Sequence, residues 1–107
     1  MSDDVELTVV TLGLDAIDEP SAGKLLGVLA KYVVVARGHG GCRNIDLVAS
    51  VTQPGRYLLV QKWESPAAQQ AHFDSADMVE MAEACRGLLS RPPSVELWEG
   101  LSAHDLA

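Results

Sequence analysis

One stretch of the chain, Arg56–Phe73, changes from the period of a strand to the period of a helix within a few residues. In its first half every second residue falls on the same side, and these residues are Tyr57, Leu59, Gln61 and Trp63. A period of two residues with aromatic and aliphatic side chains is typical of a strand, which we predict over residues 57–64.

A helix start follows this strand directly. Ser65 can accept a hydrogen bond from an unpaired N–H group of a first helical turn, and Pro66 has no N–H to lose there. The same helix carries His72. The sequence therefore predicts that the indole of Trp63 and the imidazole of His72 lie near one end of a sheet, and we expect a functional site at that end.

The remaining elements follow from the same two periods. Further strands are predicted over residues 5–14, 42–52 and 94–101, and helices over 21–36 and 65–91, the second with a pause at 75–77. Residues 53–56 have proline and glycine where a type II turn needs them, so the second and third strands form a hairpin. The order β-α-β-β-α-β predicts an α+β fold of the ferredoxin-like, split βαβ type, in which both helices pack on one face of an antiparallel sheet.

Length and charge narrow the classes of partner. A chain of 107 residues is expected to form one domain, spanning residues 1–107 with a flexible tail at 102–107. The net charge of −7, with only eight Lys and Arg residues, argues against nucleic acid and anionic membranes as partners, because both require clustered positive charge.

The expected compartment is the cytoplasm. The N-terminal residues do not form a basic segment followed by an apolar run, and no apolar stretch is long enough to span a bilayer. In a reducing compartment Cys42 and Cys85 are expected to be small buried side chains rather than a disulfide or a nucleophile.

Apolar residues occur on both sides of several predicted strands. They are Leu7 and Val9 against Val10 and Leu12, and Leu59 against Leu58 and Val60. Helices on one face would leave the other apolar face open to water, which is an aggregation hazard in a monomer. We therefore expect a homodimer in which two sheets pack face to face.

Several short segments together carry a resemblance to a known family. They are Gly41-Cys42, Asp46-Leu47, Pro54-Gly55-Arg56-Tyr57, Trp63-Glu64-Ser65, Ala71-His72-Phe73 and Ser75. With these segments the chain resembles the antibiotic biosynthesis monooxygenase (ABM) family of small dimeric α+β barrel proteins over nearly its whole length. The strand end Trp63-Glu64-Ser65, followed by Ala71-His72-Phe73, is the most specific part of the resemblance.

The resemblance implies a pocket between sheet and helices, and oxygenation of an electron-rich aromatic, quinol or polyketide-like substrate without metal or flavin. Such a substrate, once deprotonated, can itself give an electron to O₂, so the protein supplies a dry pocket, a base and donors for the developing anion. His72 is the candidate base, because an imidazole changes charge near neutral pH. Trp63 is the candidate donor or stacking wall. The candidate substrate-binding residues are Asn44, Asp46, Tyr57 and Gln61.

Structural roles remain open for most of these residues. Trp63 can be a core tryptophan, His72 can hold a strand end or a partner subunit, and Asp46 can be an exposed or interface charge. Met78 and Met81, at helical spacing, are expected in the core, and His39 between glycines is expected to be a solvated loop residue.

Three other functions remain open on the same residues. An isomerase or lyase acting on a small carbonyl compound would need the same base and donors without O₂. A non-catalytic dimeric binding or stress-response protein would need only the pocket. Haem degradation, found in one branch of the superfamily, is disfavoured. The positions that hold a tryptophan and a haem-ligating histidine in that branch fall on His72 and Ala82, and the first predicted strand contains no asparagine.

Overall fold

A computed structural model describes residues 7–101 and shows four strands and three helices. In chain order they are β1 (Thr8–Asp15), α1 (Glu19–Arg37), β2 (Cys42–Ala49), β3 (Arg56–Trp63), α2 (Pro66–Phe73), α3 (Ala76–Ala84) and β4 (Ser94–Glu99). The predicted order is confirmed, and the pause predicted at residues 75–77 is a break between two helices.

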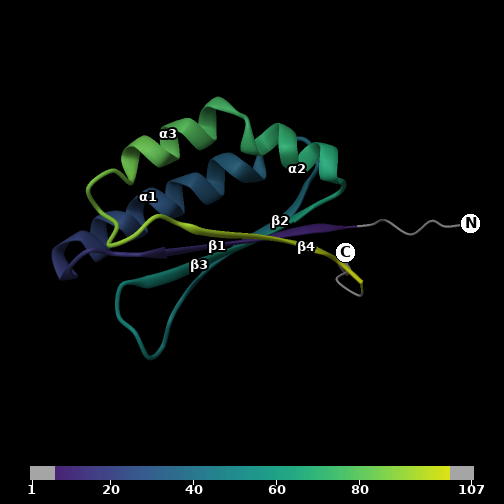
Figure 1. Ribbon diagram of the computed structural model, residues 1–107. Helices are drawn as coiled ribbons and strands as arrows, with labels where there is room; N and C mark the ends of the chain where they lie inside the picture. The colour runs from purple at the N-terminus through teal and green to yellow at the C-terminus, as the bar shows by residue number, and fades with distance from the viewer. Residues whose placement is uncertain (1–6, 102–107) are drawn as a thin grey trace, which may run out of the picture.

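The strands form one antiparallel sheet in the order β2-β3-β1-β4, with all three helices on one face (Figure 1). This is the ferredoxin-like arrangement that the sequence predicts. In the register, Leu12 of the central strand β1 lies opposite Leu59 of β3 and Val95 of β4. Within residues 7–101, no helix has the length and apolar character needed to cross a membrane.

Side-chain caps start each helix where the sequence supplies an oxygen. Asp18 accepts from the N–H of Ser21 at the start of α1, and Ser65 accepts from the N–H of Ala68 at the start of α2. Ser75 caps α3 in the same way, which is why the predicted long helix restarts there. Each cap satisfies a backbone donor that the first helical turn leaves unpaired.

Two predicted C-terminal boundaries were wrong by three residues or more. β2 ends at Ala49 rather than at residue 52, because Ser50 Oγ accepts from the backbone N–H groups of the next turn. α3 ends at Ala84 rather than at residue 91, and Gly87 follows with a φ of +81°, a left-handed conformation that stops a helix. Residues 5–6 of the first predicted strand and the predicted tail, 102–107, lie outside the described residues.

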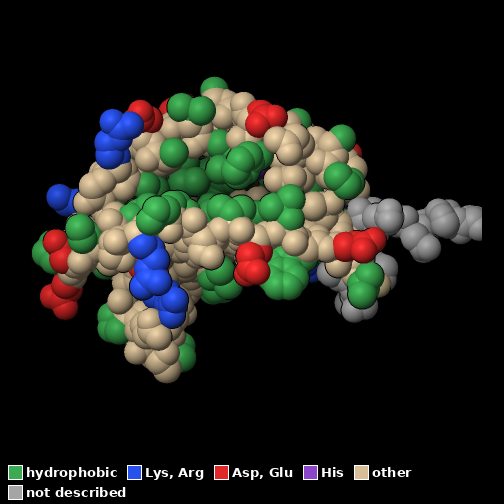
Figure 2. Space-filling model, viewed as in Figure 1, with side chains coloured by type: hydrophobic (Ala, Val, Ile, Leu, Met, Phe, Trp, Pro, Cys, Tyr) green, Lys and Arg blue, Asp and Glu red, His purple; other side chains and the backbone are tan. Residues whose placement is uncertain are grey.

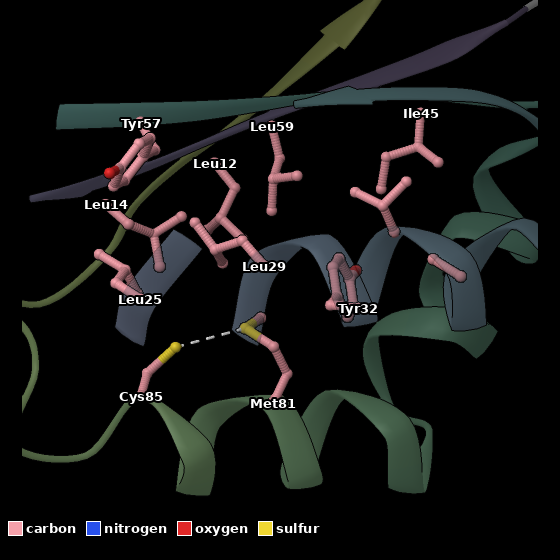
Figure 3. Packing of buried hydrophobic residues seen from close by; sticks show 12 residues of the cluster. Leu12, Leu14, Leu25, Leu29, Tyr32, Ile45, Tyr57, Leu59, Met81 and Cys85 are labelled. Atoms are coloured by element: carbon pink, nitrogen blue, oxygen red, sulfur yellow. Dashed lines mark hydrogen bonds between the residues drawn. The ribbon is translucent and has the colours of Figure 1, made fainter. Parts of the chain in front are cut away.

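The core lies between the sheet and α1, with α3 closing it from the other side of α1 (Figure 3). Its fully buried side chains come from the helix-facing side of the strands and from the stripe of α1 that faces them. They include Leu14, Leu25, Leu29, Ile45 and Leu59. This burial fixes which side of β3 faces the helices, and so places Gln61 and Trp63 inside the molecule.

The opposite face of the sheet is not covered by any described residue. By the strand register this outer face carries the apolar side chains Val9, Val48, Leu58, Val60 and Trp98. Trp98 is 49% exposed, although its indole N–H donates to Thr11 Oγ1 at 3.0 Å. The predicted second apolar face is therefore present.

Candidate active site

Four buried side chains form one chain of hydrogen bonds at the end of β3. The indole N–H of Trp63 donates to Gln61 Oε1 at 2.9 Å, and Gln61 Nε2 donates to the hydroxyl oxygen of Tyr32 at 3.0 Å. The Tyr32 hydroxyl in turn hydrogen-bonds His72 Nε2. All four residues are buried, and His72 is only 3% exposed. Such a buried polar network is stable only if its members satisfy one another.

Three elements bring these residues together. Gln61 and Trp63 are two residues apart on β3, so both face the helices. Tyr32 comes from the buried stripe of α1. α2 follows β3 after two residues and returns His72 over the strand end, where its ring stacks on that of Trp63 with centroids 4.6 Å apart.

The donors in this chain fix its direction. An indole nitrogen can only donate, so the amide of Gln61 must present its oxygen to Trp63 and its nitrogen to Tyr32. The Tyr32 oxygen accepts from Gln61, and its own proton has two acceptors within reach, His72 Nε2 and Met78 Sδ. When this proton is donated to His72, neutral His72 carries its ring proton on Nδ1, which is buried with no hydrogen-bond partner among the described residues.

Burial keeps the two ionisable members of the hydrogen-bond chain, His72 and Tyr32, uncharged. It lowers the pKa of His72 from its ordinary value of 6.5 to about 4, with a further lowering from His39 and an opposing effect of Asp77. Burial also raises the pKa of Tyr32 to about 12, although the hydrogen bond from Gln61 opposes this. At neutral pH the imidazole and the phenol are both neutral.

A second pair of residues lies against His72. His39 Nε2 and Asp77 Oδ2 are 2.6 Å apart, and the His39 ring meets the His72 ring edge-on with centroids 4.5 Å apart. The pair ties the α1–β2 loop to α3. The expectation that His39 is a solvated loop residue was wrong, because its side chain is only 23% exposed and is held on both sides.

An apolar cleft of about 540 Å³ lies between the sheet and α3. Figure 2 shows it as a hollow lined by hydrophobic side chains. It exists because no helix covers the β4 side of the sheet, where Leu97 on the helix-facing side is 58% exposed. Met78 lines the cleft, and its sulfur lies 3.2 Å from the Tyr32 hydroxyl. One flexible methionine side chain therefore separates the cleft from the hydrogen-bond chain.

Another hollow, of about 470 Å³, lies between α1 and α3. Tyr32 and Asp77 line it together with Lys24, Lys31 and Glu80. The walls of this hollow come from two helices and carry charges of both signs. The apolar cleft between the sheet and α3, in contrast, lies against the sheet and is mainly apolar. The cleft is the better candidate for an apolar substrate.

The predicted site residues do not all meet. Trp63, Gln61 and His72 lie together in the hydrogen-bond chain. Asn44 and Asp46 lie on the outer face of the sheet, where the Asn44 amide donates to Asp46 Oδ2 at 3.1 Å.

Tyr57 lies six residues before Trp63 on the same strand, toward its other end. Its hydroxyl donates to the carbonyl of Ala22 at 3.2 Å. Tyr57 is therefore bonded to the start of α1 and takes no part in the hydrogen-bond chain.

Sequence reasoning missed three members of the site. Tyr32 fitted the buried stripe of α1 so well that its hydroxyl was overlooked, although a buried tyrosine hydroxyl usually needs a partner. His39 was assigned to an exposed loop because its neighbours are glycines. Asp77 lies in the first turn of α3, where an acidic residue is common and does not by itself indicate a site. No group of three or more His, Cys, Asp and Glu side chains within residues 7–101 could hold a metal ion.

The antiparallel sheet with its helices on one face first places the chain among proteins with a ferredoxin-like α+β fold. Residues 14–84 match the family described as antibiotic biosynthesis monooxygenase. The match covers well over half of the chain, so the protein belongs to the antibiotic biosynthesis monooxygenase family. A search of curated proteins found no match.

Solved structures agree with this fold. The structure of Rv0793 from Mycobacterium tuberculosis is 24% identical with a TM-score of 0.81, over 92% of this chain and 99% of that one. A Nitrosomonas europaea protein provisionally named an antibiotic biosynthesis monooxygenase is 13% identical with a TM-score of 0.84, over 95% and 97%. NE2512 from the same organism, described as a protein of unknown function, is 21% identical with a TM-score of 0.84, over 96% and 97%.

Proposed function

We propose that this protein is a cofactor-independent monooxygenase that oxidises a small aromatic, quinol or polyketide-like compound with O₂. One observation carries the proposal: a directed chain of hydrogen bonds ends at an ionisable pair, Tyr32 and His72, one methionine away from an apolar cleft. Membership of the family and the name of the N. europaea structure support it.

The chemistry requires the protein to remove one proton. A hydroxyl or acidic C–H of the substrate gives its proton to the Tyr32 oxygen, while Tyr32 passes its own proton to His72 Nε2. The resulting substrate anion is electron-rich and gives an electron to O₂. For an anthrone-type substrate, a CH₂ group becomes a carbonyl that contains one atom of O₂, and the other atom leaves as water with the two hydrogens.

The remaining residues support this proton transfer. Gln61, oriented by Trp63, donates to the Tyr32 oxygen, which leaves the Tyr32 proton available to His72. The charge of Asp77 favours protonated His72, although burial and His39 oppose protonation more strongly and lower its pKa. A substrate anion beside Tyr32 would favour it further, because opposite charges at close range raise the pKa of an imidazole.

Complete burial of the chain supports a second candidate function. His72 has a pKa of about 4, and Met78 stands between Tyr32 and the cleft, so the closed protein is a poor proton acceptor. A non-catalytic protein that binds a small hydrophobic ligand would need the cleft and not the proton transfer. An isomerase or lyase would need the proton transfer and not O₂.

Oxygen uptake separates these functions. The purified, metal-stripped protein is incubated with hydroquinones and anthrones under ¹⁸O₂, and products are analysed by mass spectrometry. The proposal predicts uptake above the spontaneous rate and one ¹⁸O atom in each product molecule. Product formation without uptake would indicate an isomerase or lyase, and thermal stabilisation by the compounds without turnover would indicate a binding protein.

His72→Ala tests the assigned base. We expect kcat to fall by a factor of about 10² to 10⁴, the usual contribution of a positioned general base. Gln69→Ala is the matched control, because Gln69 is a buried polar residue on the same helix and lies outside the hydrogen-bond chain. If His72→Ala lowers the melting temperature strongly and leaves kcat unchanged, His72 has a structural role only.

We also propose that the protein is a cytoplasmic homodimer that pairs through the outer face of the sheet. The exposed side chains Val48, Leu58 and Trp98 on this face support the pairing, since burying them removes apolar surface from water.

A further inference from the structure

The charged residues that line the apolar cleft all have one sign. The cleft wall is formed mainly by apolar side chains of β1, α2, α3 and β4, and within residues 7–101 its only charged residues are Arg86 and Arg91. No carboxylate of the described residues lines it. This is unexpected in a chain of net charge −7, in which acidic residues outnumber basic ones by almost two to one.

Both arginines are also ion-paired, but their carboxylate partners do not line the cleft. Asp15 Oδ2 lies 3.1 Å from Arg91 Nε, and Asp15 Oδ1 lies 3.2 Å from Arg56 Nε outside the cleft. Arg86 pairs with Glu83 at 2.9 Å on the surface. The charged groups that a ligand inside the cleft meets are therefore guanidinium groups.

The end of α3 opposes the charge of Arg86 only in part. The last carbonyl groups of a helix carry about half a negative charge, and α3 ends close to Arg86. The full positive charge of the guanidinium group exceeds this partial charge. Figure 2 shows both basic and acidic side chains around the hollow.

The cleft is thus polarised along its length. Met78, next to the Tyr32 hydroxyl, lies at one end, and Arg86 follows it by eight residues. α3 continues for six residues after Met78, about 9 Å along its axis at 1.5 Å per helical residue, and Arg86 lies two residues beyond its end at Ala84. A ligand that spans this distance has an apolar body near Met78 and an anionic group near Arg86 and Arg91.

We propose that the cleft takes a planar hydrophobic carboxylate, with the carboxylate held by Arg86 and Arg91 and the ring system directed at Tyr32. Guanidinium groups bind carboxylates through paired hydrogen bonds, and the exposed rim lets the carboxylate keep part of its hydration. This inference rests on the proposed function only in taking the cleft as the substrate site. It makes Arg86 and Arg91 specificity-determining residues.

A matched pair of ligands tests the proposal without turnover. Anthracene-2-carboxylate and anthracene-2-carboxamide differ in charge and hardly in shape, and the fluorescence anisotropy of the anthracene ring reports binding to the full chain under nitrogen. We expect the carboxylate to bind about tenfold more tightly at low salt, and the preference to shrink at 0.5 M salt because exposed charges are screened.

The variants Arg86→Gln and Arg91→Gln locate the effect. Each is expected to reduce the preference to about threefold, whereas Lys24→Gln, which removes the same charge from the α1–α3 hollow, should leave it unchanged. Equal binding of the two ligands, an equal effect of all three variants, or no binding of either ligand at 1 mM would overturn the proposal. If the protein shows no oxygen uptake, the monooxygenase proposal fails and a measured carboxylate preference still holds. If the protein turns over substrate without a carboxylate preference, only the proposed role of Arg86 and Arg91 is refuted.

Discussion

At the scale of single residues, the site depends on the direction of one hydrogen-bond chain. Trp63 orients the amide of Gln61, Gln61 donates to the hydroxyl oxygen of Tyr32, and Tyr32 connects this chain to His72. The sequence predicted Trp63, Gln61 and His72 because the strand alternation and the helix start place them on one side. It could not predict Tyr32, since the contact joins residues 40 positions apart and periodicity says nothing about which buried residues meet.

Tyr32→Phe tests the centre of the chain. The change leaves Gln61 Nε2 without its acceptor and His72 Nε2 without its donor, both in a buried environment. We expect the free energy of unfolding to fall by about 2 to 4 kcal/mol, because each buried unpaired group costs about 1 to 3 kcal/mol. Urea unfolding followed by tryptophan fluorescence measures this.

Tyr57→Phe provides the matched control for that substitution. Tyr57 is a buried tyrosine whose hydroxyl makes one hydrogen bond, to the Ala22 carbonyl. Its loss is expected to cost about 1 kcal/mol. Equal losses for the two variants would show that the Tyr32 hydroxyl is no more than one ordinary hydrogen bond.

His72 makes stability depend on pH. Its pKa is about 4 in the folded protein and 6.5 when unfolded, so between these values the unfolded state binds more protons. Stability is therefore complete above about pH 6.5 and falls as the pH drops toward 4, by up to about 3 kcal/mol. Urea unfolding at pH 7, 6 and 5 measures the slope, and His72→Gln should flatten it. A wild-type curve parallel to that of His72→Gln would contradict the assignment.

At the scale of secondary-structure elements, sequence predicted every strand and helix but not every boundary. The type II turn at residues 53–56 is confirmed, with Gly55 at a φ of +83° and the Arg56 N–H donating to the Gln53 carbonyl. The end of α3 was predicted too late because the two prolines at 92 and 93 are a stronger helix-stop signal in the sequence than a single glycine. Gly87 ends the helical run earlier, and Leu88 and Leu89 still pack against the core from the following turn.

Gly41 joins the α1–β2 loop to α2 in a way that only glycine permits. Its φ is +88°, and a Cβ at this position would lie 2.5 Å from Ala68 Cβ on α2. Gly41→Ala is expected to lower the free energy of unfolding by more than about 2 kcal/mol, because backbone strain and a steric clash add. The measurement is urea unfolding at pH 7.

Two other glycines separate the sources of that loss. Gly87 has a φ of +81° with open space around its Cβ position, so Gly87→Ala reports strain alone and should cost about 1 kcal/mol. Gly40 has neither feature, and Gly40→Ala should change stability by less than about 0.5 kcal/mol. A series in which Gly41→Ala is no worse than Gly87→Ala would show that α2 moves away from the loop without cost.

At the scale of the whole molecule, the sheet has two apolar faces and helices for only one. The alternation of side chains within the strands predicted the second apolar face, because this prediction depends only on the strands and not on where each helix packs. The cleft could not be predicted in the same way, since it arises where α3 packs on α1 and leaves the β4 side of the sheet open.

Leu58→Asp tests the proposed homodimer. Leu58 lies on the outer face of β3, where a carboxylate would be buried against a second sheet, so we expect dimers to become monomers in light scattering coupled to gel filtration. Val51→Asp, which adds the same charge in the fully exposed β2–β3 turn, should leave the mass unchanged. A monomeric wild-type chain at micromolar concentration would refute the dimer.

The directed hydrogen-bond chain also constrains how this chain can change during evolution. A phenylalanine at position 63 would remove the donor that orients Gln61, and the amide could then turn and present its oxygen to Tyr32. The Tyr32 proton would point at the amide, and His72 would have to supply a proton from Nε2 instead of accepting one. Positions 32, 61, 63 and 72 are therefore coupled, because a substitution at one of them changes the hydrogen-bonding role that is required at the others.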